Sequence, residues 1–218
     1  MMMVIFDLDG TLLDTSPGIL ECVRYASEKL GYPELPHEKL LTFIGPPLKD
    51  SFMRCYGCDE AEAERLTATY REHYRKGALL NAIPYNGILE LCETLKAAGV
   101  QLAVATSKPQ AFSEQVLRHF GFDRYLDVIF GADMAGHLSK ADLIRQCVGD
   151  KDPSACVMVG DTEYDAIGAQ EANVPFLAVS YGFGNKEKML SYPHIGIAEK
   201  PMDIIEILAD HESLITRN

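Results

Sequence analysis

The sequence lacks the features that mark several classes of protein. No apolar run in its 218 residues approaches the roughly eighteen that a membrane-spanning helix needs. Basic side chains are scarce, because 20 lysines and arginines stand against 32 aspartates and glutamates and give a net charge of −12. Such an acidic chain is not expected to bind nucleic acid or anionic membranes constitutively. The six cysteines are irregularly spaced and do not form a disulfide framework.

We expect no signal peptide, and phosphate-binding glycine loops are also missing. The apolar start, residues 1–6, is too short for the core of a signal peptide and has no basic flank. No P-loop, internal repeat or low-complexity segment is present. Hydrophobic residues make up 47% of the chain, which is enough to form a core. We therefore expect a soluble, reduced, cytoplasmic protein with no nucleic-acid or membrane partner.

Short apolar runs alternate with amphipathic stretches along most of the chain. Strands that are buried on both faces of a parallel sheet are apolar throughout. Runs of this kind predict strands at 3–8, 100–105, 128–131, 155–159, 176–179 and 195–198. Helical periodicity predicts helices at 86–98, 109–120, 140–148, 162–172 and 202–209. The alternation predicts an α/β fold with a doubly wound, Rossmann-like parallel sheet.

A long segment interrupts this alternation after the first strand. From residue 16 to residue 82 we find no convincing strand, and the periodicity predicts helices at 17–30, 36–44, 48–55 and 59–76. A crossover between parallel strands needs only one helix, so about seventy residues are far more than the topology requires. We predict a catalytic α/β core of residues 1–15 and 83–218, with residues 16–82 inserted as an all-helical cap over the strand ends.

Two aspartates follow the first predicted strand, in the run Asp7-Leu8-Asp9-Gly10-Thr11. Because side chains alternate along extended backbone, Asp7 and Asp9 are expected on one side, at the strand end where α/β folds bind ligands. Two carboxylates repel each other unless a cation intervenes, and Mg²⁺ prefers oxygen ligands. Gly10 allows a sharp turn beside the ligand. An ordinary acidic turn is the alternative interpretation.

Three further predicted strand or helix ends carry polar side chains. Thr106 ends a strand, where its hydroxyl can donate to a phosphate oxygen, and Ser107 is either a second contact or a helix N-cap. Lys140 falls in the first turn of a helix, where a cation opposes the helix dipole, and such local conflicts often mark functional sites. A solvated lysine is the alternative.

The fourth strand end repeats the placement of Asp7. Asp161 directly follows a predicted strand, and Asp165 lies in the first turn of the next helix, where an acid is favourable even without a function. If all these groups share one crevice, its carboxylates repel each other strongly. Mg²⁺ together with Lys140 would turn that crevice into a clamp for a phosphate group.

The run Val4-Ile5-Phe6-Asp7-Leu8-Asp9-Gly10-Thr11 closely resembles the nucleophile motif of the haloacid dehalogenase (HAD) superfamily of aspartate-based phosphatases. The resemblance implies that Asp7 attacks phosphorus to form an aspartyl-phosphate. It implies that Asp9 protonates the leaving oxygen and then activates water. Thr106 matches the hydroxyl of the second family motif. Lys140, or else Lys108, matches the lysine that neutralises the nucleophile and the phosphoryl group.

Residues 160–165 are similar to the Gly-Asp-x-x-x-Asp motif of the same family, whose acids bind Mg²⁺ directly and through water. The resemblance therefore implies Mg²⁺ as cofactor. Its implied metal ligands are Asp7, Asp9, Asp161 and Asp165. The phosphate or substrate contacts that we expect are Gly10, Thr11, Ser107 and, as a basic candidate in the insertion, Lys49.

Segments beyond the motifs resemble one branch of the family. Residues 43–51, which include Lys49, are similar to phosphoglycolate phosphatase-like members and to related bacterial 5′-nucleotidases, and residues 181–184 and 198–201 fit the same branch. The branch implies a phosphomonoesterase for a small phosphorylated metabolite, with phosphoglycolate as the first candidate and a nucleoside monophosphate as the alternative. The stretch 182–184 lacks the third glycine of a dinucleotide fingerprint and is interpreted as a loop.

Two other functions stay open. A non-catalytic receiver module would accept phosphate on Asp7 without turnover, but it needs neither Asp9 nor a long insertion. A β-phosphoglucomutase-like phosphomutase is disfavoured, because that branch has a histidine soon after residues 14–15, and here none occurs before His37.

Overall fold

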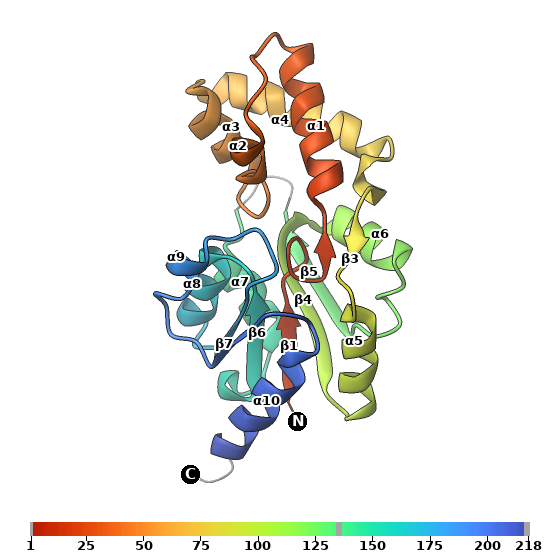
Figure 1. The fold of residues 1–218 in the computed structure, drawn as a ribbon, viewed down its shortest axis with the longest axis vertical. Helices are drawn as coiled ribbons and strands as arrows, with labels where there is room; N and C mark the ends of the chain where they lie inside the picture. The colour runs from red at the N-terminus through yellow and green to blue at the C-terminus, as the bar shows by residue number, and fades with distance from the viewer. Residues whose placement is uncertain (1, 134–136, 216–218) are drawn as a thin grey trace. The chain divides into compact units, whose positions relative to one another are not determined.

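The computed structural model describes residues 2–133 and 137–215 (Figure 1). The chain forms two compact units, which we call the core unit (Met1–Leu13 and Pro84–Asn218) and the helical unit (Asp14–Ile83). The insertion predicted from the sequence spans 16–82, and the helical unit spans Asp14–Ile83. The chain enters the helical unit through β2 (Leu13–Asp14) and leaves it through β3 (Ile83–Pro84), and these two strands pair with each other.

The core unit is built on a six-stranded parallel sheet. In spatial order its strands are β5 (Val128–Ala132), β4 (Gln101–Pro109), β1 (Met3–Phe6), β6 (Cys156–Gly160), β7 (Phe176–Val179) and β8 (Gly196–Ala198). The register pairs Phe6 with Val104 on one side and with Val159 on the other. The three central strands therefore reach the same edge of the sheet together.

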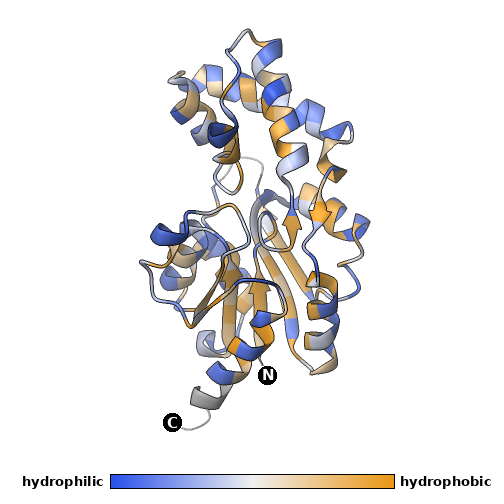
Figure 2. Ribbon diagram, viewed as in Figure 1, coloured by the Kyte–Doolittle hydropathy of each residue, from blue (hydrophilic) through white to orange (hydrophobic). Residues whose placement is uncertain are grey.

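Helices cover this sheet, which confirms the predicted doubly wound α/β class. They are α5 (Ile88–Ala97), α6 (Gln110–His119), α7 (Lys140–Val148), α8 (Glu163–Glu171), α9 (Lys186–Met189) and α10 (Asp203–Ile215), with a 3₁₀ turn at Pro153–Ala155. Ile5 and Met158 of the strands pack in one buried cluster with Leu143 of α7. In Figure 2 the strands form the most hydrophobic part of this unit.

The helical unit has a small core of its own. It contains α1 (Ser16–Lys29), α2 (His37–Leu41), α3 (Leu48–Tyr56), α4 (Glu60–Arg75) and a 3₁₀ turn at Ala78–Leu80. Phe43 and Phe52 meet edge to face at 5.0 Å, and both are buried. Asp59 begins α4 with a capping box, in which its side chain accepts from the backbone N–H of Glu62. Among the described residues, no helix is both long and apolar enough to cross a membrane.

An ion pair and a hydrogen bond hold Asp127, the residue before edge strand β5, against the sheet. Lys96 Nζ of α5 lies 2.9 and 2.8 Å from the two carboxylate oxygens of Asp127, and the backbone N–H of Leu102 donates to Asp127 at 2.8 Å. Burial alone would raise the pKa of Asp127. The hydrogen bonds from Lys96 and Leu102 outweigh burial and hold the pKa of this carboxyl below its ordinary value.

We expect Asp127→Asn to lower the free energy of unfolding by about 0.5 kcal/mol at pH 7, because the pair is partly exposed and screened by solvent. A carboxyl with a depressed folded-state pKa stabilises the protein above its ordinary pKa of about 4 and loses that effect as the pH falls through the folded value. Urea unfolding of both proteins at pH 7, 5 and 3 measures this difference. A difference that is equally large at pH 3 and pH 7 would contradict it.

Candidate functional site

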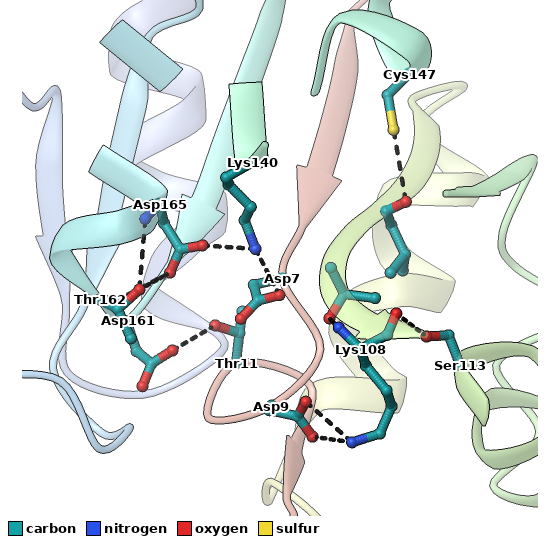
Figure 3. Close-up of polar contacts among 12 residues, drawn as sticks. Asp7, Asp9, Thr11, Lys108, Ser113, Lys140, Cys147, Asp161, Thr162 and Asp165 are labelled. Atoms are coloured by element: carbon teal, nitrogen blue, oxygen red, sulfur yellow. Dashed lines mark hydrogen bonds and ion pairs between the residues drawn. The ribbon is translucent and has the colours of Figure 1, made fainter. Parts of the chain in front are cut away.

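Three carboxylates meet at the carboxyl edge of the central strands. Asp7 follows β1, Asp161 follows β6, and Asp165 lies in the first turn of α8 (Figure 3). The backbone N–H of Asp7 donates to the carbonyl of Val159 at 2.9 Å, which continues the β1–β6 register past the strand end. One oxygen from each of the three side chains lies within 4.8 Å of the others, and all three residues are buried. The shared strand edge therefore brings together acids that are far apart in the sequence.

Lys140 reaches into this acidic cluster from the start of α7. Its Nζ lies 2.7 Å from Asp7 Oδ1 and 2.7 Å from Asp165 Oδ1. Only 8% of the Lys140 side chain is exposed, so the interpretation as a solvated lysine is wrong. Ser139 and Asp142 form a capping box, which fixes the start of α7 and thereby the position of Lys140 as its first residue.

The Asp161 carboxylate is held by backbone that passes unusually close to it. Its Oδ2 accepts from the N–H groups of Phe183 and Gly184 at 2.7 and 3.3 Å, and its Oδ1 accepts from the Thr11 hydroxyl at 3.3 Å. A Cβ built on Gly10 or on Gly182 would lie 2.3 Å from Asp161 Oδ2. Only glycine allows the backbone to approach so closely on both sides of this carboxylate.

The charges of the cluster are unbalanced. Burial, together with the neighbouring charges of Asp165 and Asp9, raises the pKa of Asp7 to about 6 against the opposing effect of Lys140. Burial likewise holds the pKa of Asp161 well above its usual range, and Asp165 and Asp7 add to this effect. Burial opposes the charge on Lys140, but its attraction to Asp165 and Asp7 wins and raises its pKa.

These residues fit a hard divalent cation. Three buried carboxylates supply oxygen ligands only, and one lysine cannot neutralise all three. A cation placed among them would offset the burial and the mutual repulsion that favour protonation of Asp7 and Asp161. The acidic cluster of Asp7, Asp161 and Asp165 is thus the candidate metal site.

The structure corrects the expectation for Asp9. The extended strand ends at Phe6, and the chain then turns, with the Leu13 N–H donating to the Leu8 carbonyl at 3.1 Å. Asp9 therefore does not follow the alternation of a strand, and its carboxylate does not belong to the metal-binding cluster. Both of its oxygens instead accept from Lys108 Nζ, at 2.8 and 3.0 Å (Figure 3).

The segment after Thr106 also differs from its prediction. β4 runs on to Pro109, and α6 begins at Gln110, so Ser107 is not the N-cap of that helix. The polar residues 106–109 resemble a helix start in sequence, but they remain part of the sheet. Thr106 is buried, and its hydroxyl accepts from the backbone N–H of Lys108 at 3.2 Å.

The remaining candidate contacts are engaged within the protein. The N–H of Gly10 donates to the Leu13 carbonyl and that of Thr11 to the Leu8 carbonyl, so both backbone donors are used within the turn. Lys49 of α3 forms ion pairs with Glu60 and Glu64 of α4, and its charge is thereby neutralised inside the helical unit. The two N–H groups that hold Asp161 could not be predicted from the sequence, because backbone donors have no residue-type signature.

Comparisons with known proteins indicate the family of this chain. The model of the haloacid dehalogenase-like hydrolase family matches residues 4–179. A 5′-nucleotidase of Pseudomonas aeruginosa is 40% identical over 192 residues, which cover 87% of each chain. The tyrosine-protein kinase PtkA of Mycobacterium tuberculosis is 36% identical over 85% of this chain and 64% of its own length. The crystal structure of a predicted phosphatase from Clostridium acetobutylicum is 36% identical, has a TM-score of 0.86, and matches over 98% of this chain and 97% of its own.

We expect Gly182→Ala to weaken divalent-cation binding about tenfold or more. A methyl group 2.3 Å from Asp161 Oδ2 forces the carboxylate away from its two N–H donors, and loss of such outer partners reduces metal affinity about 10- to 100-fold. Calorimetric titration with Mg²⁺ measures the effect. Gly99→Ala is the control, because Gly99 also has a positive φ of +80° but a Cβ added there would meet no neighbouring atom within 4 Å, so the change should lower stability without changing affinity. Equal affinities of Gly182→Ala and the parent would contradict the assignment.

Proposed function

Because this chain belongs to the haloacid dehalogenase-like hydrolase family and is an enzyme of its phosphatase type, we propose that it hydrolyses a small phosphate monoester through an aspartyl-phosphate on Asp7, with Mg²⁺ as cofactor. The observation that carries the proposal is the buried contact between Asp7 and Lys140, 2.7 Å apart beside Asp161 and Asp165. A carboxylate that is held by an ammonium group and has two further acids beside it suits phosphoryl transfer.

The first half-reaction transfers the phosphoryl group to the enzyme. An oxygen of the Asp7 carboxylate attacks phosphorus, the ester P–O bond breaks, and the departing alcohol oxygen takes a proton from Asp9. Lys140 remains beside Asp7 and offsets negative charge on the phosphoryl oxygens. The Thr106 hydroxyl, at the same edge of the sheet, is proposed to donate to one of these oxygens.

The second half-reaction regenerates the enzyme. Water attacks the phosphorus of the aspartyl-phosphate, Asp9 accepts a proton from that water, and the P–O bond to Asp7 breaks to release inorganic phosphate. Asp7, Asp161 and Asp165 would hold Mg²⁺. When bound, the ion neutralises charge on the phosphoryl group and on the acids around it.

A nucleoside monophosphate is our first candidate substrate. The identity of 40% with a 5′-nucleotidase over most of both chains supports this class, and it reverses the order that the sequence alone suggested, in which phosphoglycolate came first. Phosphoglycolate is the second compound to test. The two differ in their leaving alcohols but share the phosphate monoester that the proposed chemistry requires.

We expect Asp7→Asn to reduce phosphate release by about a thousandfold or more, because the amide is a poor nucleophile. Release of phosphate from nucleoside monophosphates, phosphoglycolate and p-nitrophenyl phosphate measures this loss. Asp150→Asn, at an exposed position just after α7, is the control and should keep parental activity. If the parent protein becomes stably phosphorylated but releases no phosphate, it is a receiver-type module and the proposal is wrong.

We expect chelation by EDTA to abolish turnover and added Mg²⁺ to restore it. The reason is that three buried carboxylates then face the anionic substrate, and Lys140 is the one described cation that pairs with them. The rate of phosphate release is measured before chelation, after chelation, and after Mg²⁺ is added back. Full activity in metal-free buffer would show that the acidic cluster has another role.

A further inference from the structure

Lys108 is buried against Asp9, the residue to which the proposed function gives both proton transfers. Its Nζ lies 2.8 and 3.0 Å from the two oxygens of the Asp9 carboxylate, and the side chains are only 5% and 9% exposed. A charged pair removed from water in this way contributes little net stability, since desolvation offsets the attraction. A charge-assisted contact to both oxygens does, however, keep the carboxylate directed toward the ammonium group.

An irregularity in β4 directs Lys108 to this place. Thr106 pairs with Gly131 of β5, but Pro109 pairs with the very next residue, Ala132, so the chain between them bulges out of register. The bulge is anchored at Lys108, whose N–H donates to the Thr106 hydroxyl and whose carbonyl accepts from the Ser113 hydroxyl, both at 3.2 Å. Bulges commonly redirect a side chain beside an active site.

Two lysines of the core unit with buried side chains contact different acids. Lys140 contacts Asp7 and Asp165, whereas Lys108 contacts Asp9 (Figure 3). The sequence presents Lys108 only as an alternative for the role of Lys140. In the structure both lysines are in use at once, so Lys108 has a role of its own.

We propose that Lys108 is the positioning residue of the acid/base Asp9. It holds the Asp9 carboxyl in one orientation through both half-reactions and makes or breaks no covalent bond itself. Proton transfer requires the carboxyl to lie within hydrogen-bond reach of the leaving oxygen and then of water. Without its ammonium partner the Asp9 carboxylate is free to turn away. This inference rests on the proposed function, because it concerns how that reaction is performed.

The two half-reactions should respond differently to loss of Lys108. With p-nitrophenyl phosphate the leaving group departs as a stable anion and needs no proton, so Asp7 is still phosphorylated at nearly the parental rate. Hydrolysis of the aspartyl-phosphate still needs Asp9. Lys108→Met should therefore accumulate the phosphoenzyme and release a burst of nitrophenolate, close to one per active site, before a steady rate about a hundredfold below that of the parent.

With an alkyl phosphate such as a nucleoside monophosphate, both half-reactions need Asp9. Here kcat should fall about a hundredfold or more without a burst, while KM changes little, because Lys108 contacts the acid rather than the substrate. If Lys108 instead bound the substrate phosphate, Lys108→Met would raise KM for both substrates and would show no more burst than the parent.

The experiment combines stopped-flow kinetics with a double-mutant cycle. Lys108→Met, Asp9→Asn and the double variant are compared with the parent, and Lys96→Met is the matched control, since Lys96 also contacts both oxygens of an aspartate but outside the site. We expect the double variant to be no slower than Asp9→Asn alone, because Lys108 acts through Asp9. The control should keep the parental kcat and show no added burst.

The outcomes separate the inference from the proposed function. A parent protein without turnover overturns the proposed function and this inference with it. If the parent turns over but Lys108→Met lacks the burst, the inference alone is overturned. The same holds if the parent turns over and the double variant is slowed by the product of the two single effects. If Lys108→Met does not fold, as judged by circular dichroism, Lys108→Gln replaces it and must give the same burst.

Discussion

Three buried carboxylates at one edge of the sheet repel one another, and much of the surrounding chain serves to hold them there. The register of β1 with β6 fixes Asp7 beside Asp161. The capping box of α8, in which the Asp165 carboxylate accepts from the N–H and hydroxyl of Thr162, keeps one oxygen of Asp165 engaged with its own helix. Lys140 then bridges Asp7 and Asp165. The site is thus a local excess of negative charge that a stable fold maintains, as expected where function takes precedence over stability.

The sequence predicts the sheet well because its strands are buried on both faces. The apolar runs at Phe176–Val179 and the helix at Lys140–Val148 have the predicted limits. The short elements β2, β3 and α9 were missed, because two to four residues are too few to show a period. The prediction for residues 106–109 was wrong for another reason: their polar side chains suggest a helix start, but pairing with β5 keeps them in the sheet.

Within the candidate site, the sequence allowed prediction only of residues whose own charged side chain takes part. Asp7, Asp161, Asp165 and Lys140 are brought together as the strand ends suggested. The partner of Asp9 was not foreseen, because the chain turns after Phe6 and the alternation of a strand no longer applies. The loop that holds Asp161 was not foreseen either, because its contribution is backbone N–H, and its glycines reveal a close approach only once the carboxylate is in place.

The pairing of β2 with β3 has a consequence for how such a protein can change over evolutionary time. Both junctions of the helical unit leave from one two-stranded ribbon, so the ends of the insertion are neighbours in space. Loop-closure entropy depends only weakly on the length of chain between two such fixed ends. Modules of very different size could therefore be exchanged at this ribbon while the sheet and its acids stay the same. The inserted unit and the acidic edge of the sheet can then diversify independently within one architecture.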